Sequence, residues 1–248
     1  MSRLPIALLS PDPNAPFPPV GRALREPDGL LAAGGDLSPT RLLNAYRHGI
    51  FPWFGEGQPI LWWSPAPRMV FETHGFRLAS RFRRQLAKSS WVVRADTAFA
   101  KVITACATSA RPGQDGTWIT ADMIAAYRQL HRLGHAHSIE VFDGESLVGG
   151  IYGVAVGQMF FGESMFSARS GGSKLALAGL ARLLAGWDWP LIDAQLENPH
   201  LISLGAREMP RDRFITQVET LTARAGRPGP WTSDVGDWRA SAFAKPLD

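Results

Sequence analysis

Two apolar runs joined by Asp143-Gly144 constrain the fold more than any other feature of the sequence. Residues 137–142 and 146–156 flank this dipeptide, and Asp-Gly is typical of a tight hairpin turn because it tolerates positive φ. Gly157-Gln158 predicts a second turn, which leads into residues 159–166. The sequence therefore predicts a three-stranded antiparallel meander over residues 137–166.

Helical patterns surround this meander. Thr120 is a typical N-cap for a helix that runs to Gly134, and residues 173–185 and 211–223 predict two further helices. An apolar strand at 190–196 lies between the last two. The order α-β-β-β-α-β-α resembles the acyltransferase fold of the acetyl-CoA-dependent N-acetyltransferases, a similarity that fixes no substrate by itself. We expect an α+β protein with an acetyltransferase-like (GNAT-type) domain.

The first third of the chain is divided by prolines. Repeated prolines in residues 1–20 predict an extended arm over the surface. Ser38 and Pro39 predict the start of a short helix that ends at Gly49. Tryptophan and proline then recur between residues 51 and 65, so we place a junction there. We expect a small N-terminal α/β domain at 1–66 and a catalytic domain at 67–248, with a partly disordered tail after Arg224.

Composition excludes several classes of protein. The chain has 248 residues, of which 45% are hydrophobic, so it can bury a sizeable core. A single cysteine, Cys106, excludes an intrachain disulfide framework, and no Cys/His spacing fits a structural zinc site. With neither a long apolar run nor a signal-peptide pattern, a cytoplasmic protein is expected. The net charge of +4 favours polyanionic partners.

Polar residues interrupt two of the predicted strands. Asp193 and Gln195 share one face of strand 190–196, because side chains alternate along a strand. They are either a hydrogen-bonded structural pair or part of a site. By the same alternation, Glu163 shares a face with Phe161 and Met165. A carboxylate among apolar groups needs a cationic partner, which either the protein or a substrate supplies.

Three further patterns allow a functional and a structural interpretation. The glycine-rich stretch 169–174 precedes a helix and is similar to a pyrophosphate loop, but Lys174 stands where coenzyme A enzymes are expected to have Gly or Ala. His135 and His137 are placed better for entry into a strand than for binding a metal, because no third ligand is near. A basic run fits one or two faces of a helix, and its structural interpretation is a solvated surface. It comprises Arg77, Arg81, Arg83, Arg84 and Lys88.

Taken together, ordered motifs along the chain resemble one known family, the bacterial leucyl/phenylalanyl-tRNA–protein transferases. The resemblance runs from about residue 17 to about residue 214. Its motifs are GGDLS at 34–38, HGIFPWF at 48–54, WWSP at 62–65, GTWIT at 116–120, GHAHSIE at 134–140, GG at 149–150, GESMFS at 162–167 and IDAQ at 192–195.

The resemblance implies an activity and a set of partners. Members of this family move Leu, Phe and, less readily, Met from aminoacyl-tRNA to the N-terminal Arg or Lys of acceptor proteins, which marks these proteins for degradation through the N-degron pathway. The family also implies a cytoplasmic monomer that acts without coenzyme A. Two other functions stay open, which are a peptide N-acetyltransferase using acetyl-CoA and a tRNA-binding module without catalysis.

The resemblance also implies roles for individual residues. Residues matching Glu163, Asp193 and Gln195 lie at the catalytic centre of the family, and those matching Trp53 and Trp118 lie near the terminal adenosine of the donor. We expect Asp193 to orient Gln195, Gln195 to hold the attacking amine, and Glu163 to bind the cationic acceptor or the reacting centre. Phe160, Met165, Ile151 and Leu180 are candidate walls of an apolar donor pocket. The basic run is the candidate tRNA-binding surface.

Overall fold

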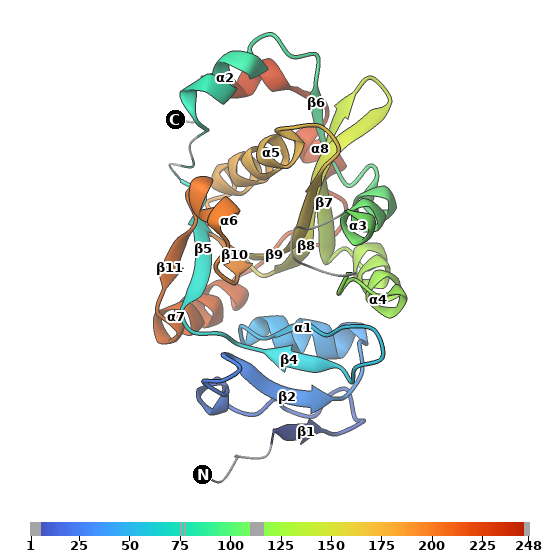
Figure 1. The fold of residues 1–248 in the computed structure, drawn as a ribbon, viewed down its shortest axis with the longest axis vertical. Helices are drawn as coiled ribbons and strands as arrows, with labels where there is room; N and C mark the ends of the chain where they lie inside the picture. Colours follow the sequence, from blue (N-terminus) through green and yellow to red (C-terminus); the bar gives the residue numbers. More distant parts are fainter. Residues whose placement is uncertain (1–5, 75, 77, 110–116, 246–248) are drawn as a thin grey trace.

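Two β-sheets organise the computed structural model, which describes residues 6–74, 76, 78–109 and 117–245 (Figure 1). The smaller, four-stranded sheet has the order β1-β2-β4-β3. The larger, eight-stranded sheet has the order β11-β5-β10-β9-β8-β7-β6-β12. Every strand of the smaller sheet precedes residue 64 in the chain, and every strand of the larger sheet follows residue 67.

The smaller sheet lies at the N-terminal end and is covered by one helix on its inner side (Figure 1). Its elements are β1 (Ala7–Leu9), β2 (Leu30–Gly34), α1 (Pro39–Arg47), β3 (Phe51–Pro52) and β4 (Leu61–Trp63). The predicted helix is confirmed, and the Ser38 side chain accepts a hydrogen bond from the Arg41 N–H as its N-cap. The helix contacts elements of the larger part, so it forms the layer between the two sheets.

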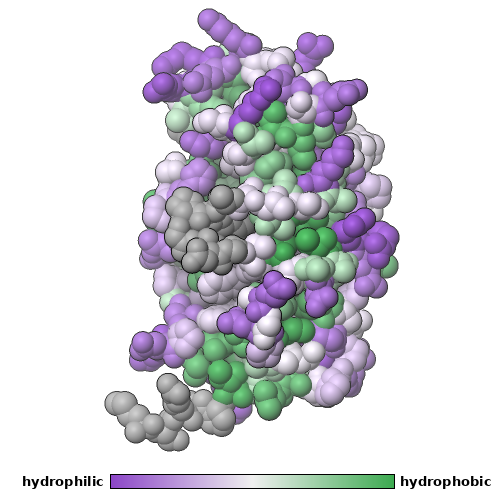
Figure 2. Space-filling view, turned by 45° about the vertical axis from the view of Figure 1, so that its right-hand side comes forward, coloured by the Kyte–Doolittle hydropathy of each residue, from purple (hydrophilic) through white to green (hydrophobic). Residues whose placement is uncertain are grey.

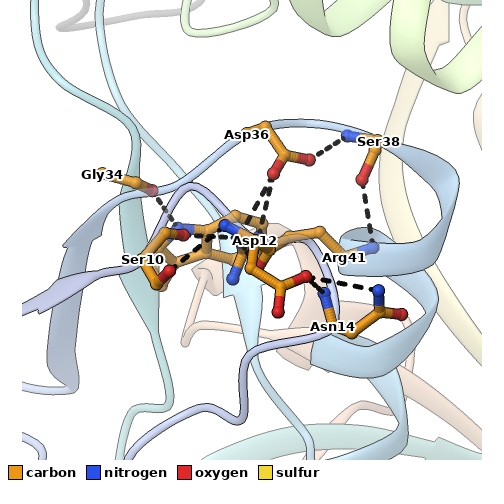
Figure 3. A network of polar contacts seen from close by, with 8 residues as sticks. Ser10, Asp12, Asn14, Gly34, Asp36, Ser38 and Arg41 are labelled. Carbon is orange, nitrogen blue, oxygen red and sulfur yellow. Dashed lines mark hydrogen bonds and ion pairs between the residues drawn. The ribbon is translucent and has the colours of Figure 1, made fainter.

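The extended surface arm predicted over residues 1–20 is present in the described residues 6–20, which are exposed or half-buried, but it also takes part in the smaller sheet. β1 pairs in parallel with β2, so the arm contributes an edge strand. The fully buried Arg41 donates to the carbonyl oxygens of Ser10 and Asp12, each at 2.7 Å, and pairs with Asp36 at 3.2 Å (Figure 3). This network fixes the arm because prolines leave it few backbone donors of its own.

The predicted meander is the centre of the larger sheet. β7 (Ala136–Asp143), β8 (Ser146–Val156) and β9 (Met159–Ser167) pair antiparallel in sequence order, which confirms the hairpin prediction. The outer strands β5 (Arg68–Glu72), β6 (Val92–Ala95) and β11 (Arg207–Met209) were not predicted. They are short and pair with distant partners, so they carry little local signal.

Helices cover both faces of this sheet. One face packs against α5 (Gly172–Gly186), and the other packs against α3 (Phe99–Thr108), α4 (Ala121–Arg132) and α7 (Arg211–Thr222). The helices expected from the sequence near residues 120, 173 and 211 are confirmed, whereas α3 was not predicted. None of the helices in the described part of the chain is long and apolar enough to cross a membrane.

The sheet opens between β9 and β10 (Leu191–Gln195). These two strands are parallel and α5 connects them, but only two residue pairs join them, Phe160 with Ile192 and Phe161 with Asp193. Beyond these pairs, the carboxyl ends of both strands are not paired with each other. The short helix α6 (Pro199–Ser203) follows β10 directly. The opening is therefore bounded by β9, β10 and α6.

The expectation of a disordered tail after Arg224 was wrong for the described residues up to 245. Trp231 is only 1% exposed, α8 (Thr232–Val235) follows it, and β12 (Trp238–Arg239) pairs with β6. The 3-10 turn η2 (Ala240–Phe243) then buries Phe243. Glycine, proline and serine obscured this segment in the sequence because single tryptophan anchors, rather than a periodic pattern, hold it in place.

Candidate active site

Glu163 lies on β9 at the opening of the sheet and is the centre of a buried hydrogen-bond network. Its Oε1 accepts from the Tyr46 hydroxyl and from Gln195 Nε2, both at 2.8 Å, and its Oε2 accepts from the Tyr127 hydroxyl at 2.9 Å. The two tyrosine hydroxyl oxygens also lie in contact with each other, although each carries one proton and cannot donate to Glu163 and to the other hydroxyl at the same time. The network thus joins α1 of the N-terminal part, α4, β9 and β10.

Burial raises the pKa of Glu163 to about 7, although the hydrogen bonds from Tyr46 and Tyr127 oppose this shift. Burial and the neighbouring Glu163 hold the pKa values of both tyrosines well above their ordinary value. A carboxyl group whose pKa lies near neutrality can both accept and release a proton at physiological pH. The tyrosines remain hydroxyl donors throughout that range.

Asp193 is fully buried on β10 and is held by a buried arginine. Arg68, from β5, donates from Nε to Oδ1 at 2.8 Å and from Nη2 to Oδ2 at 2.7 Å. The rings of Phe51 and Phe214 lie 4.7 and 4.6 Å from the Arg68 guanidinium carbon, so they enclose it. A bidentate pair of this kind fixes both groups in orientation. Because both carboxylate oxygens of Asp193 accept hydrogen bonds from Arg68, we infer that Asp193 positions neighbouring residues.

Gln195 takes its orientation from a break in the strand. Its φ is +63°, and the pairing of β10 with β5 shifts register between Asp193 and Gln195. Asp193 Oδ1 accepts from the Gln195 N–H at 2.9 Å, which stabilises this left-handed conformation. Non-glycine residues in such a conformation cost free energy and are found frequently at functional sites. The expected contact between Asp193 and Gln195 is therefore present, through the backbone of Gln195.

The prediction that Glu163 shares a face with both Phe161 and Met165 was half wrong. A β-bulge lies at Glu163, because Tyr152 of β8 pairs with Ser164 while Gly153 pairs with Gly162. Glu163 stays on the side of Phe161, where Tyr46 lies, and Met165 turns to the α5 side. An extra residue in one strand reverses the alternation beyond it, and the sequence showed no sign of it.

A cavity of about 380 Å³ occupies the opening between β9 and β10. Its apolar walls are Phe71, Ile151, Met165, Leu177, Ile192 and Leu201, and its polar end contains Glu163, Ser164, Gln195, Asn198 and His200. Burial is the main cause that lowers the pKa of His200, and the positive charge of Lys174 lowers it further. The cavity thus combines an apolar chamber with converging polar groups, as ligand sites do.

Only half of the expected pocket walls face this cavity. Ile151 and Met165 line it, but Phe160 and Leu180 do not, because both are fully buried in the core between the sheet and α5. Side chains at the centre of a packed layer cannot also face an opening at its edge. Trp53 and Trp118 are half-buried against the core of the opposite face, and Trp53 also packs edge-on against Trp63 at 5.4 Å.

The glycine-rich stretch before α5 packs against the protein. The Ser173 N–H donates to Ser167 Oγ at 2.8 Å, and the Gly172 N–H donates to the Arg169 carbonyl. The Phe82 ring lies so close to Gly171 that an added Cβ would meet it at 2.5 Å. The helix N-terminus is therefore covered by side chains, which disfavours the pyrophosphate-loop interpretation of this stretch.

The basic run is divided between one short helix and its flanks. Arg81, Arg83 and Arg84 lie on α2 (Ser80–Leu86), Lys88 follows the end of that helix, and Arg77 lies outside the described residues. Hydrophilic residues gather at the upper end of the molecule in Figure 2, the end at which α2 lies in Figure 1. All described members are exposed except Arg83, which is half-buried.

His137 belongs to a second buried polar cluster, whose residues do not line the cavity. Its Nδ1 lies 2.8 Å from Asp96 Oδ2, and its ring stacks on Trp231 at 3.6 Å. Among the described residues, no group of three or more histidine, cysteine or acidic side chains could hold a metal ion. His137 therefore has a structural contact that accounts for its position.

Sequence reasoning missed Arg68, Tyr46 and Tyr127. Both tyrosines occur at helical spacing among apolar residues, where packing in the core is the ordinary interpretation, and Arg68 follows a proline-rich junction without any periodic pattern. The chain has three tyrosines, and all of them are fully buried. Because a buried tyrosine hydroxyl needs a hydrogen-bond partner, the scarcity and helical placement of tyrosine was the one available signal.

Comparison with known proteins gives consistent matches over most of the chain. A family model described as leucyl/phenylalanyl-tRNA protein transferase matches residues 70–219, and the model of that family's N-terminal domain matches residues 35–66. A protein from Xanthomonas campestris pv. campestris (strain B100), named leucyl/phenylalanyl-tRNA–protein transferase, is 66% identical over 244 residues, which cover 98% of both chains.

Two further relatives carry the same name. The protein from Xanthomonas axonopodis pv. citri (strain 306) is 67% identical and covers 96% of both chains. The protein from Xylella fastidiosa (strain M23) is 62% identical and covers 93% of this chain and 95% of its own.

Proposed function

The chain belongs to the leucyl/phenylalanyl-tRNA protein transferase family, and from this membership we propose that it is an aminoacyltransferase that moves Leu, Phe and, less readily, Met from tRNA to acceptor proteins. The acceptor group is the α-amino group of an N-terminal Arg or Lys. The product is thereby marked for degradation by the N-degron pathway. The protein acts as a monomer in the cytoplasm.

The observation that carries this proposal is the contact of Gln195 with Glu163 at the polar end of the apolar cavity. Gln195 Nε2 donates to Glu163, so the amide oxygen of Gln195 is free to accept from an attacking amine. In the reaction, the amine nitrogen bonds to the ester carbonyl carbon, the bond to the ribose oxygen breaks, and one proton passes from the amine to that oxygen. The ester is already activated, so positioning supplies much of the rate.

Glu163 and Gln195 have different tasks in this reaction. An amide is a poor base, so Gln195 orients the amine while a stronger acceptor takes its proton. Glu163 has a pKa of about 7 and a buried position next to Gln195, so it attracts the cationic acceptor and handles a proton at the reacting centre. The ribose 2′-hydroxyl or a water molecule completes the transfer to the leaving oxygen.

Four further residues position this pair. Asp193, held by Arg68, fixes the backbone of Gln195, and Tyr46 and Tyr127 fix both oxygens of Glu163. Because Tyr46 comes from α1, the small N-terminal part completes the catalytic centre. The two separate sheets support a division into residues 1–66 and 67–248, and the contact of Tyr46 with Glu163 supports the need for both parts in activity.

The donor binds on the remaining surfaces. Its Leu or Phe side chain enters the apolar chamber beside Ile151 and Met165, where each buried methylene contributes about 0.8 kcal/mol. Trp53 and Trp118 are each only half-buried, so the terminal adenine can stack on them. The basic run of Arg77, Arg81, Arg83, Arg84 and Lys88 contacts the phosphates of the acceptor stem.

The acetyltransferase-like (GNAT-type) label for the larger part also belongs to this proposal. It is supported by the antiparallel meander, the crossover through α5, and the separation of two parallel strands around the candidate site. Coenzyme A is not part of the proposal, because side chains cover the helix N-terminus that would meet its pyrophosphate.

One competition experiment tests this function. The protein is incubated with Leu-tRNA, acetyl-CoA and a peptide that begins with Arg, and the mass of the product is measured. We expect the peptide to gain one leucyl group at its N-terminus, whereas the same peptide with a blocked N-terminus stays unmodified. An acetylated peptide, or no change of mass with either donor, would contradict the proposal.

A further inference from the structure

Of the six histidines in the chain, all of them within the described residues, His200 alone lines the catalytic cavity. It lies at the start of α6, where the Asn198 side chain accepts a hydrogen bond from the His200 N–H at 2.8 Å. The His200 carbonyl oxygen accepts from Ser203 Oγ at 2.7 Å. Both hydrogen bonds use the backbone of His200, so they hold the residue in place without occupying its ring.

The imidazole ring of His200 is open to a substrate and to solvent. The residue is exposed, and neither nitrogen of the ring has a hydrogen-bond or ion-pair partner among the described residues. A neutral imidazole has one nitrogen that can accept a proton. Because the ring borders both the cavity and the bulk water, it can take a proton from a ligand and release it to the solvent.

Charged groups on several elements act on this ring. Partial burial and then the positive charge of Lys174, from α5, lower the pKa of His200 below its ordinary value of 6.5. Glu163 on β9 and Asp193 on β10 line the same cavity, and the exposed Glu197 precedes α6. Since the pKa is lowered in the presence of all these groups, the ring is uncharged near pH 7 and able to accept a proton.

The proposed reaction has two protons to move, and Glu163 accounts for one of them. The α-amino group of the acceptor has an ordinary pKa of about 7.7–8.0, so it arrives mostly as an ammonium ion at neutral pH. It loses one proton before its nitrogen can attack, and a second one, which ends on the ribose oxygen, as the amide forms. The first proton leaves for the solvent. Glu163 is only 7% exposed and both its oxygens accept hydrogen bonds, so it is poorly placed to release that proton.

We propose that His200 takes the first proton from the ammonium group of the acceptor and releases it to water. This inference rests on the proposed function, because it assigns a further catalytic residue to the same reaction. The N–H bond of the ammonium ion breaks, and its electron pair stays on nitrogen as the lone pair that attacks the ester. The proton bonds to a ring nitrogen of His200 before it passes to the solvent. Gln195 then holds the neutral amine, and Glu163 handles the remaining proton.

The pH dependence of two histidine variants tests this role. Single-turnover transfer from Leu-tRNA to a peptide that begins with Arg is measured by rapid quenching at about pH 6.5 and about pH 9, on either side of the amine pKa. We expect H200A to slow transfer by about 10²-fold at the lower pH, the usual contribution of a general base. At the higher pH the amine arrives without its extra proton, so the loss should be less than about twofold. H200Q keeps a polar side chain but supplies no base, so it should behave in the same way.

The matched control is H74A, since His74 is exposed and does not line the catalytic cavity. It should transfer leucine at the wild-type rate at both pH values. The inference is overturned if H200A and H200Q transfer normally at the lower pH, if H74A slows transfer as much, or if the loss is equal at both pH values, as a purely structural role would give. A wild-type protein that transfers no leucine at either pH would instead contradict the proposed function itself, so the two failures are distinguishable.

Discussion

Two buried glutamates sit in similar surroundings but in different parts of the molecule. Glu163 is 7% exposed and Glu140 is fully buried, and burial raises the pKa of each to about 7. Each also accepts hydrogen bonds from hydroxyl groups. Glu163 accepts from Tyr46 and Tyr127, whereas Glu140 accepts from Ser138 and Thr97.

The surroundings beyond these hydroxyls differ. Glu163 contacts Gln195 and lines a cavity with apolar walls. Glu140 lies beside Asp96, whose carboxylate accepts from His137 and from the Trp231 N–H at 2.8 Å, so that region fixes the C-terminal tail to the sheet. A raised pKa therefore does not identify a functional site by itself. The cavity and its converging polar groups make the difference.

The largest expected effect is the difference in stability loss between two ion pairs. One is the buried pair of Arg68 and Asp193 beside the cavity, and the other is the exposed pair of Arg94 and Asp237 near Glu140. Removing Asp193 leaves Arg68 buried and unpaired, so D193A should lower the free energy of unfolding by about 3–5 kcal/mol and abolish transfer. D237A removes the exposed partner of Arg94 and should cost about 1 kcal/mol or less, with transfer retained. Denaturant unfolding and a transfer assay measure both. Equal losses of stability would show that the two pairs are equivalent.

The second effect is shared by both glutamates. The ordinary pKa is 4.5 and the folded value is about 7 for each, so the folded state retains a proton that the unfolded chain releases as the pH rises through this interval. The contribution of these two groups to stability is therefore greatest below about pH 4.5 and falls as the pH rises to about 7, by on the order of 3 kcal/mol per group.

Unfolding free energies at about pH 5 and pH 8 test this pH dependence. E163Q and E140Q should each flatten it by a similar amount, because glutamine does not titrate. If both variants keep the pH dependence of the wild type, then each glutamate has the same pKa in the folded and the unfolded chain, which contradicts the prediction.

The smallest expected effect removes one hydroxyl donor from each glutamate. Tyr127→Phe and Ser138→Ala should each cost about 1 kcal/mol of stability, the typical net value of one hydrogen bond. Only Tyr127→Phe should slow transfer, by about tenfold, because it loosens Glu163 at the reacting centre. A comparable loss of transfer in Ser138→Ala would show that the tail cluster also takes part in catalysis.

The central elements of the fold could be predicted, because they carry local signals. The hairpin turn at Asp143-Gly144, the Ser38 cap and the Thr120 cap each fix an element within a few residues. The strands β5 and β6 and helix α3 could not be predicted in this way. They depend on partners far away in the sequence, such as Asp193 for Arg68 and Asp237 for Arg94.

The candidate site was predicted in its polar residues and less well in its apolar ones. Alternation along β10 placed Asp193 and Gln195 together. The β-bulge in β9, which turns Met165 away from Glu163, leaves no sign in the sequence pattern. Choosing Leu177 rather than Leu180 as a cavity wall requires the position of the opening, which depends on how far β10 separates from β9. Local patterns indicate faces, whereas cavities result from the arrangement of whole elements.

The most direct test compares the two glutamates in a single-turnover transfer assay. E163Q and E140Q are each mixed with saturating Leu-tRNA and a peptide that begins with Arg, after circular dichroism has shown that both are folded. We expect E163Q to slow transfer by about 10²-fold or more, the usual range for a proton-handling group, and E140Q to retain the wild-type rate within about twofold. A near-normal rate in E163Q, or an equal loss in E140Q, would contradict the assignment of the catalytic centre to the cavity between β9 and β10.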